Sequence, residues 1–260
     1  MTARRAVSCL LQLAVIAYLL AMLALYAMQR SLLFYPQPLK VTPDAPEIRF
    51  ATSGLTLRGW VVNSDRPCAI IYFGGNGESV EIDVPLFKDS VSGCSVYLIP
   101  YRGYSGNPGE PSEAALEADA LTVYDSLKSR HATVGVMGRS LGTGIATYLA
   151  ANRPVSSLLL VTPYDSIVNI GRDQYPYFPI GLLARDPFES WRSAEKVHAE
   201  TMIFIAGSDH VIPRSNTDNL ERHFRVALNV KIFSGVGHNS ISESPEYWPT
   251  VASFFGQKNR

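Results

Sequence analysis

The stretch Thr133-Val-Gly-Val-Met137-Gly138-Arg139-Ser140-Leu141-Gly142 decides the fold. An apolar run that reads as a strand passes directly into the pattern G-x-S-x-G, and the small-residue helical stretch Leu141–Ala151 follows. In a strand–turn–helix of this kind the serine has strained backbone angles, and side chains two residues to either side would clash, which explains the glycines at 138 and 142. The turn holds a hydroxyl clear of the sheet. We therefore predict Ser140 as a nucleophile.

Apolar runs of the same kind alternate with helical stretches along the rest of the chain. The runs are Ala69–Phe73, Ser95–Ile99, Thr133–Met137, Ser157–Val161, Met202–Ala206 and Ala227–Phe233. The helical stretches are Ser112–Lys128, Leu141–Ala151, Pro213–Phe224 and Ser244–Phe255. Near-continuous apolar strands are typical of a parallel sheet with helices on both faces. The pattern predicts a doubly wound, mostly parallel α/β sheet whose functional residues lie at the carboxyl ends of the strands.

A hairpin is expected before the first parallel strand. The segments Glu47–Thr52 and Leu55–Val62 are separated by the turn residues Ser53-Gly54, which favours an antiparallel pair.

The N-terminus has the composition of a membrane span. From Ala6 to Met28 the one strongly polar side chain is Gln12, and these 23 residues can cross a hydrocarbon core of roughly 30 Å. A cleaved signal peptide is the alternative, but its apolar region is usually shorter and no clear cleavage site follows. We predict an uncleaved single-pass anchor in residues 1–30. Arg4, Arg5 and the terminal amine precede it, whereas Arg30 and Lys40 follow it, and this small difference favours a catalytic domain on the exocytoplasmic side.

A stiff linker is expected after the span. Residues 31–46 contain four prolines, which disfavour regular structure. The globular domain is then residues 47–260, with a short segment rich in Tyr, Phe and Pro at 164–192 in the place of a cap.

Two cysteines precede neighbouring strands of the predicted sheet. Cys68 comes before Ala69–Phe73 and Cys94 before Ser95–Ile99, so parallel neighbours would bring the two sulfurs to the same end of the sheet. A disulfide would then fit an oxidising compartment. Two buried thiols are the alternative.

A serine nucleophile needs a base, and the base needs a group that orients it. His238 follows the last predicted strand in a glycine-flanked loop, whereas His210 is its rival. Asp209 follows the strand Met202–Ala206, and the order Ser, Asp, His is the one expected after a G-x-S-x-G turn. Asp165, after the previous strand, is the competing acid.

An oxyanion hole needs two N–H donors. One is expected from Leu141, at the start of the helix after Ser140. The other is expected from Asn76 in the glycine-rich loop Gly74-Gly75-Asn76-Gly77, because glycines let that backbone approach a substrate closely.

Taken together, these residues resemble a known family. The motifs are Gly74-Gly75-Asn76-Gly77, Tyr101-Arg102-Gly103-Tyr104-Ser105-Gly106, Gly138–Gly142, Gly207-Ser208-Asp209 with Pro213, and Gly237-His238, together with Gln29–Pro36 and the stretch from Tyr175-Pro176 to Asp186-Pro187-Phe188. The set is similar to membrane-anchored α/β-hydrolase-domain proteins, which include bud-emergence-type hydrolases and relatives that act as protein depalmitoylases. The family commonly has His-Gly where this chain has Gly74-Gly75.

The resemblance implies an α/β-hydrolase fold and hydrolysis of acyl esters or thioesters by Ser140, His238 and Asp209. It implies no metal and no organic cofactor. A membrane anchor suggests lipophilic substrates, as an inference from location.

Other functions stay open. Serine aminopeptidase-like amide hydrolysis and acyl transfer use the same residues, and a catalytically silent membrane-tethered scaffold is a third alternative. Lys plus Arg and Asp plus Glu both number 23, so no basic excess favours nucleic-acid binding.

Overall fold

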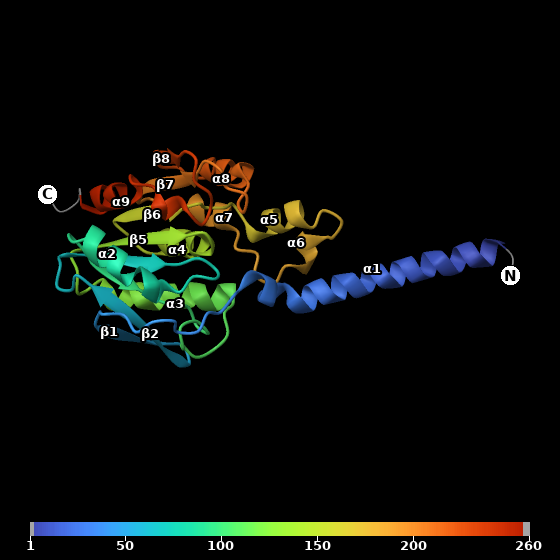
Figure 1. The fold of residues 1–260 in the computed structure, drawn as a ribbon, viewed down its shortest axis with the longest axis horizontal. Helices are drawn as coiled ribbons and strands as arrows, with labels where there is room; N and C mark the ends of the chain where they lie inside the picture. The colour runs from blue at the N-terminus through green and yellow to red at the C-terminus, as the bar shows by residue number, and fades with distance from the viewer. Residues whose placement is uncertain (1–2, 257–260) are drawn as a thin grey trace.

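The structure is a computed structural model, and it describes residues 3–256. One eight-stranded sheet forms its centre, in the order β1-β2-β4-β3-β5-β6-β7-β8 (Figure 1). The strands are β1 (Glu47–Thr52), β2 (Leu55–Val62), β3 (Cys68–Phe73), β4 (Ser95–Leu98), β5 (Thr133–Arg139), β6 (Ser157–Val161), β7 (Glu200–Ala206) and β8 (Leu228–Phe233). The first two pair antiparallel, β2 pairs antiparallel with β4, and the remaining neighbours are parallel. The predicted sheet and its N-terminal hairpin are confirmed.

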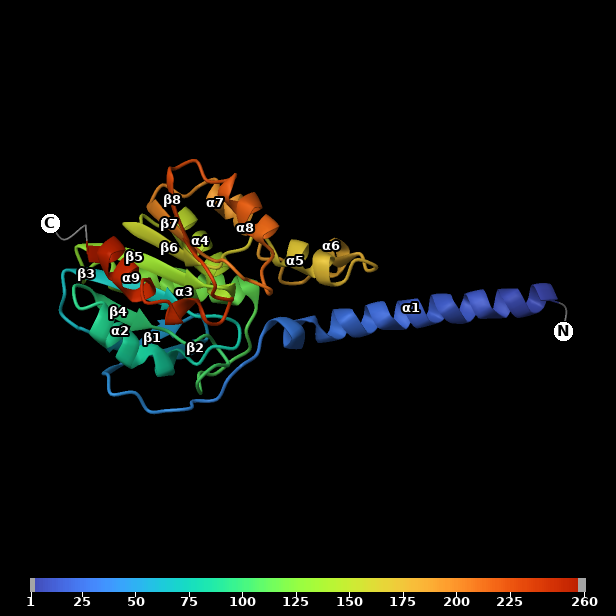
Figure 2. The same cartoon turned by 45° about the horizontal axis from the view of Figure 1, so that its top comes forward.

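Helices cover both faces of this sheet (Figure 2). Helices α3 and α4 lie over one face, and α2 and α9 over the other. The helices of the described residues are α1 (Ala3–Leu33), α2 (Val84–Ser90), α3 (Glu113–Leu127), α4 (Leu141–Asn152), α5 (Ile167–Gln174), α6 (Ile180–Leu183), α7 (Ser190–Ala194), α8 (Arg214–Glu221) and α9 (Tyr247–Gly256), with short 3-10 helices η1 (Val80–Asp83) and η2 (Ile241–Glu243). Along β3, Ile71 and Phe73 belong to the core beneath α3 and α4, whereas Ile70 and Tyr72 belong to the core beneath α2 and α9. Two covered faces are the reason that these strands are apolar throughout.

Helix α3 begins where its sequence indicates. Ser112 is the N-cap, and its hydroxyl accepts a hydrogen bond from the Ala115 N–H. The apolar stripe of Leu116, Ala120 and Leu127 is buried against the sheet.

Helix α1 extends away from the domain as a long rod (Figure 1). It is apolar and long enough to cross a membrane, and none of its most apolar stretch is buried in the protein. The helix continues to Leu33, so the first three residues of the predicted linker are helical. Phe34 then packs into the core at 2% exposure, which fixes the base of α1 to the domain.

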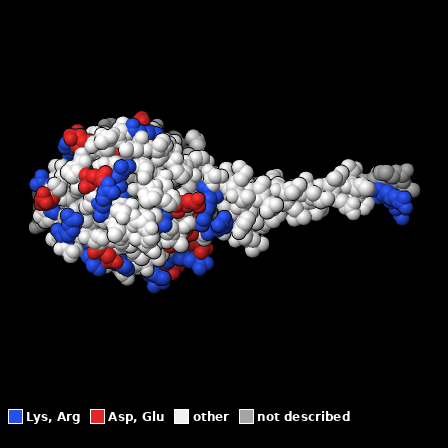
Figure 3. All heavy atoms as spheres, turned by 90° about the horizontal axis from the view of Figure 1, so that it is seen from below, with Lys and Arg blue, Asp and Glu red and all other residues white. Residues whose placement is uncertain are grey.

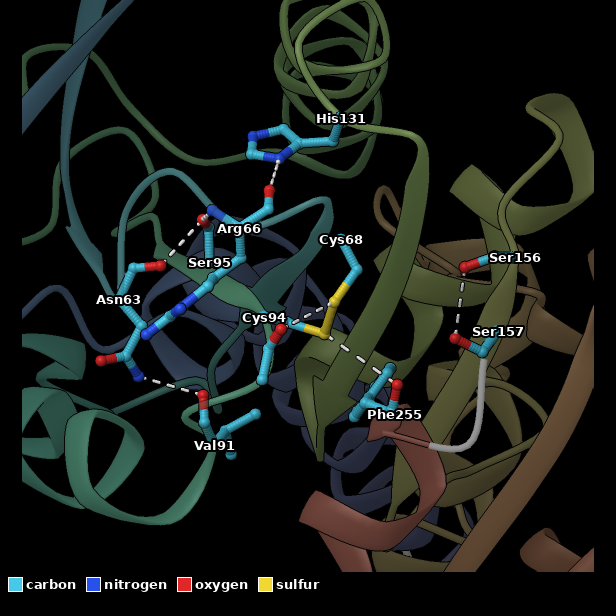
Figure 4. The surroundings of a disulfide bond; sticks show 11 residues. Asn63, Arg66, Cys68, Val91, Cys94, Ser95, His131, Ser156, Ser157 and Phe255 are labelled. Carbon is cyan, nitrogen blue, oxygen red and sulfur yellow. Dashed lines mark hydrogen bonds between the residues drawn. A yellow bond between two sulfur atoms is a disulfide. The ribbon is translucent and has the colours of Figure 1, made fainter. Parts of the chain in front are cut away.

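The structure joins Cys68 and Cys94 in a disulfide (Figure 4). The two residues lie at the start of β3 and just before β4, with their Cα atoms 4.8 Å apart. Because β3 and β4 are parallel neighbours, both chains enter the sheet at the same end. The hypothesis of a bridge is therefore confirmed over the alternative of two thiols.

Candidate functional site

Ser140 occupies a one-residue turn between β5 and α4. Its φ of 49° lies in the left-handed region, where residues other than glycine are strained. A Cβ on Gly142 would come within 2.1 Å of the Phe73 carbonyl oxygen, and one on Gly138 within 2.4 Å of the Gly142 carbonyl oxygen. The two glycines are thus required by the close packing of the turn, as the sequence predicts.

His238 and Asp209 come together beside Ser140. The Ser140 Oγ lies 2.9 Å from His238 Nε2, and His238 Nδ1 lies 2.8 Å from Asp209 Oδ2. An ionised carboxylate only accepts hydrogen bonds, so the imidazole Nδ1–H donates to Asp209 and Nε2 is left to accept from the serine hydroxyl. These are the three side chains that the sequence predicts as a group.

Asp209 is held ionised in this position. Burial opposes its ionisation, but hydrogen bonds from His238 and from the N–H groups of Val211 and Ile212 outweigh that cost and lower the pKa of the carboxyl. A charged Asp209 is the form that can orient the imidazole.

The competing residues lie elsewhere. Asp165 is buried and accepts hydrogen bonds from the side chains of Asn169, Asn216 and Asn219, so it ties α5 to α8 instead of contacting His238. His210 is exposed on the surface.

The loop after β3 faces the nucleophile. A Cβ on Gly75 would lie 3.7 Å from the Ser140 Cβ. The Asn76 carbonyl accepts from the Tyr104 hydroxyl and from the Tyr35 N–H, while its side chain donates to the Leu33 carbonyl. The Ser140 N–H donates to the Val161 carbonyl, so it is not available to bind an oxyanion. Within residues 3–256, the N–H groups of Asn76 and Leu141 have no protein acceptor.

A partly buried ion pair supports this loop. Glu78 Oε2 accepts from the Gly75 N–H at 2.8 Å and lies 3.4 Å from Arg139 Nη1. Arg139 also donates to the Asn239 carbonyl, next to His238. This pair connects the loop after β3, the turn at Ser140 and the loop that carries His238. No sequence pattern marked it, because Arg139 occupies a variable position of G-x-S-x-G.

Two tyrosines hold the same loop from the other side. The Tyr101 hydroxyl donates to the Gly74 carbonyl at 2.6 Å, and Tyr104 donates to Asn76 at the same distance. Arg102 points away and pairs with Asp119 through two hydrogen bonds, which places it in a structural role. This loop contains Gly74-Gly75, where the α/β-hydrolase-domain proteins that the sequence resembles commonly have His-Gly. In this chain Glu78, Tyr101 and Tyr104 hold the backbone of the loop through hydrogen bonds.

A cavity of about 690 Å³ opens above Ser140. Its lining includes residues near Ser140 (Asn76, Ser140, Leu141, His238), residues of α1 (Leu25, Gln29, Leu32, Leu33) and residues of the cap (Ile167, Ile170, Ile180, Leu183). Among residues 3–256, no group of three or more His, Cys, Asp or Glu side chains could hold a metal ion.

The sequence is similar to known hydrolases. Residues 108–254 match the dienelactone hydrolase family. An uncharacterized protein of Mycobacterium tuberculosis is 30% identical over 83% of this chain and 82% of its own length. Lysophosphatidylserine lipase ABHD12 of Xenopus tropicalis is 29% identical over 72% of this chain, which spans only 57% of that relative. Protein bem46 of Schizosaccharomyces pombe is 26% identical over 73% of this chain and 68% of its own length.

Solved structures share the fold. An esterase of Pyrococcus furiosus superimposes with a TM-score of 0.69 over 86% of this chain and 97% of its own, at 14% identity. A monoacylglycerol lipase of Paleococcus ferrophilus superimposes with a TM-score of 0.57 over 76% of this chain and 95% of its own, at 16% identity. Identities this low bear on the fold alone.

Proposed function

The chain belongs to the dienelactone hydrolase family of the α/β-hydrolase superfamily, and we propose that it is a membrane-anchored serine hydrolase that cleaves acyl esters or thioesters. The observation that carries the proposal is the continuous hydrogen-bond chain from Ser140 through His238 to Asp209 at the floor of a cavity. Such a chain activates a serine for attack on a carbonyl carbon.

The reaction would proceed through an acyl-enzyme. Ser140 Oγ attacks the acyl carbon while His238 Nε2 takes its proton, and Asp209 stabilises the imidazolium that forms. The N–H groups of Asn76 and Leu141 donate to the oxyanion. The bond to the alcohol or thiol then breaks, and His238 protonates the leaving group. Water repeats the sequence to release the acid.

Lipophilic substrates fit the cavity better than small polar ones. The cap and α1 together line it with aliphatic side chains, among them Leu32, Ile170 and Leu183. Relatives named as lysophosphatidylserine lipases also favour a lipid ester. An N-terminal helix embedded in a bilayer would keep residues 47–260 at the surface where such substrates reside.

The direct test is labelling of the detergent-solubilised full chain with a fluorophosphonate probe, followed by turnover of p-nitrophenyl esters and acyl thioesters. We expect wild type to react, and Ser140→Ala and His238→Ala to lose labelling and at least roughly 10³-fold in kcat. Ser129→Ala and His210→Ala, both at exposed positions, are matched controls and should retain activity. Absence of labelling in a folded wild type would overturn the proposal in favour of a silent scaffold.

A further inference from the structure

The cavity above Ser140 is bounded on one side by helix α1. Leu25, Gln29, Leu32 and Leu33 line it, at the spacing of one helix face. Leu33 lies beside the loop after β3, where its carbonyl accepts a hydrogen bond from the Asn76 side chain. Leu25 is eight residues earlier, about 12 Å further along the helix axis. The cavity therefore has an apolar part, called the limb below, which extends from Ser140 along the last turns of α1 and is lined by Leu25, Leu32 and Leu33.

The cap forms the opposite wall and is fixed to α1 by directed contacts. Arg30 Nε donates to Asp186 Oδ2 at 2.7 Å, in an ion pair whose carboxylate side chain is only 4% exposed. The Gln29 side chain donates to the Leu183 carbonyl and accepts from the Arg185 N–H. Because both partners are held, α1 keeps a defined position against α6 and does not swing freely on the linker.

The two walls remain in contact further out. The ring of Tyr18 stacks on that of Phe178 with centroids 5.4 Å apart, and its hydroxyl donates to the Tyr177 carbonyl. Figures 1 and 2 show α5 and α6 beside the part of α1 nearest the domain.

The outer parts of both walls are apolar and face outward. Residues 174–184 of the cap carry no charged side chain, and within them Tyr177 and Leu182 are 84% and 88% exposed. Helix α1 carries none between Arg5 and Arg30, and Figure 3 shows charges gathered on the domain and at the far basic end of the helix. Exposed aromatic and aliphatic side chains beside a span are typical of segments that lie in a bilayer.

We infer that α1 is one wall of the acyl-binding pocket and that the pocket opens into the bilayer between α1 and residues 174–184. The inference rests on the proposed function and names its substrate class: acyl esters whose chains reside in the membrane. Such a chain passes from lipid along Leu25 and Leu32 to Ser140 without exposing its methylenes to water. The helix thus determines specificity in addition to anchoring the protein.

The test compares two leucines of the same helix turn. Leu25 lines the cavity, whereas Leu23 is 62% exposed on the opposite face. The full chain in nanodiscs is given p-nitrophenyl laurate, carried in the bilayer, and water-soluble p-nitrophenyl butyrate. We expect Leu25→Trp to lower the laurate-to-butyrate ratio of kcat/KM about tenfold by filling the limb. Leu23→Trp should leave the ratio unchanged.

Leu32→Trp is a second variant in the same limb, and fluorophosphonate labelling verifies that each variant retains a folded site. An unchanged ratio in both limb variants, or an equal fall in Leu23→Trp, would overturn the inference. Wild type that cleaves butyrate but not laurate would overturn the inference while leaving the proposed function intact. Wild type that cleaves neither and resists labelling would overturn the proposed function, and the inference with it.

Discussion

At the scale of single residues, a cluster of partly buried acidic and basic side chains lies beside the turn at Ser140. Glu78 pairs with Arg139, and Asp83 lies close to Glu78. Burial, the nearby Glu78 carboxylate and a hydrogen bond between the two carboxyl groups raise the pKa of Asp83 to about 8. At neutral pH the folded protein therefore keeps Asp83 mostly protonated, next to Glu78, which accepts a hydrogen bond from the Gly75 N–H.

This proton predicts that stability falls in mild alkali. The pKa of Asp83 is higher in the folded state than its unfolded value of 3.8, so its protonation favours the folded state. This contribution to the free energy of unfolding is complete below about pH 4 and is lost as pH rises through 8. Between pH 7 and 9 we expect a loss of about 1 kcal/mol, or roughly 2–4 °C in Tm by scanning fluorimetry. Asp83→Asn should abolish this decline. The control Asp89→Asn, at an exposed position of α2, should retain it; a wild-type Tm flat over this range would contradict the assignment.

At the scale of elements, the cap owes its position to α1 as much as to the domain. Helix α5 is capped by Ser166, whose hydroxyl accepts from the Asn169 N–H, and α6 has only four residues. Helices this short are not stable alone, so packing decides whether they form. Here the packing partners are the domain core around Ile170 at one end and Tyr18, Gln29 and Arg30 of α1 at the other.

An environment-sensitive dye can report whether residues 174–184 enter lipid. In a Cys9→Ser background, Leu182→Cys labelled with bimane in nanodiscs should emit at shorter wavelength and be quenched by brominated lipids. Leu86→Cys, at a 45% exposed position of α2, is the matched control and should behave as in water. Equal quenching at the two positions would show that the cap does not enter the bilayer.

At the scale of the whole molecule, we propose that α1 spans a membrane and that the catalytic domain lies on its exocytoplasmic side; two features support this placement. Arg4 and Arg5 precede the span, which favours a cytoplasmic N-terminus. The domain carries the Cys68–Cys94 disulfide, and such bonds persist mainly in oxidising compartments. Both favour an exocytoplasmic catalytic domain.

Counting thiols tests this placement. Isolated membranes denatured in the presence of an alkylating reagent, without reductant, should yield protein alkylated at one of its three cysteines, Cys9, and at all three when reductant is added first. Replacing both Cys68 and Cys94 with alanine should lower the free energy of unfolding by about 3 kcal/mol, because the bond closes a loop between residues 26 apart. Three reactive thiols without reductant would indicate a reducing compartment.

The sequence by itself determined the alternation of strands and helices, the hairpin, the long N-terminal helix and the turn at Ser140. Each of these depends on hydrophobic periodicity or turn chemistry within a few residues. Only the tertiary structure placed Asp209, and not Asp165, against His238, paired Glu78 with Arg139, and laid residues 174–184 along α1. His238 is 98 residues from Ser140, and hydrogen bonds act over about 3 Å, so sheet order and loop packing decide such contacts.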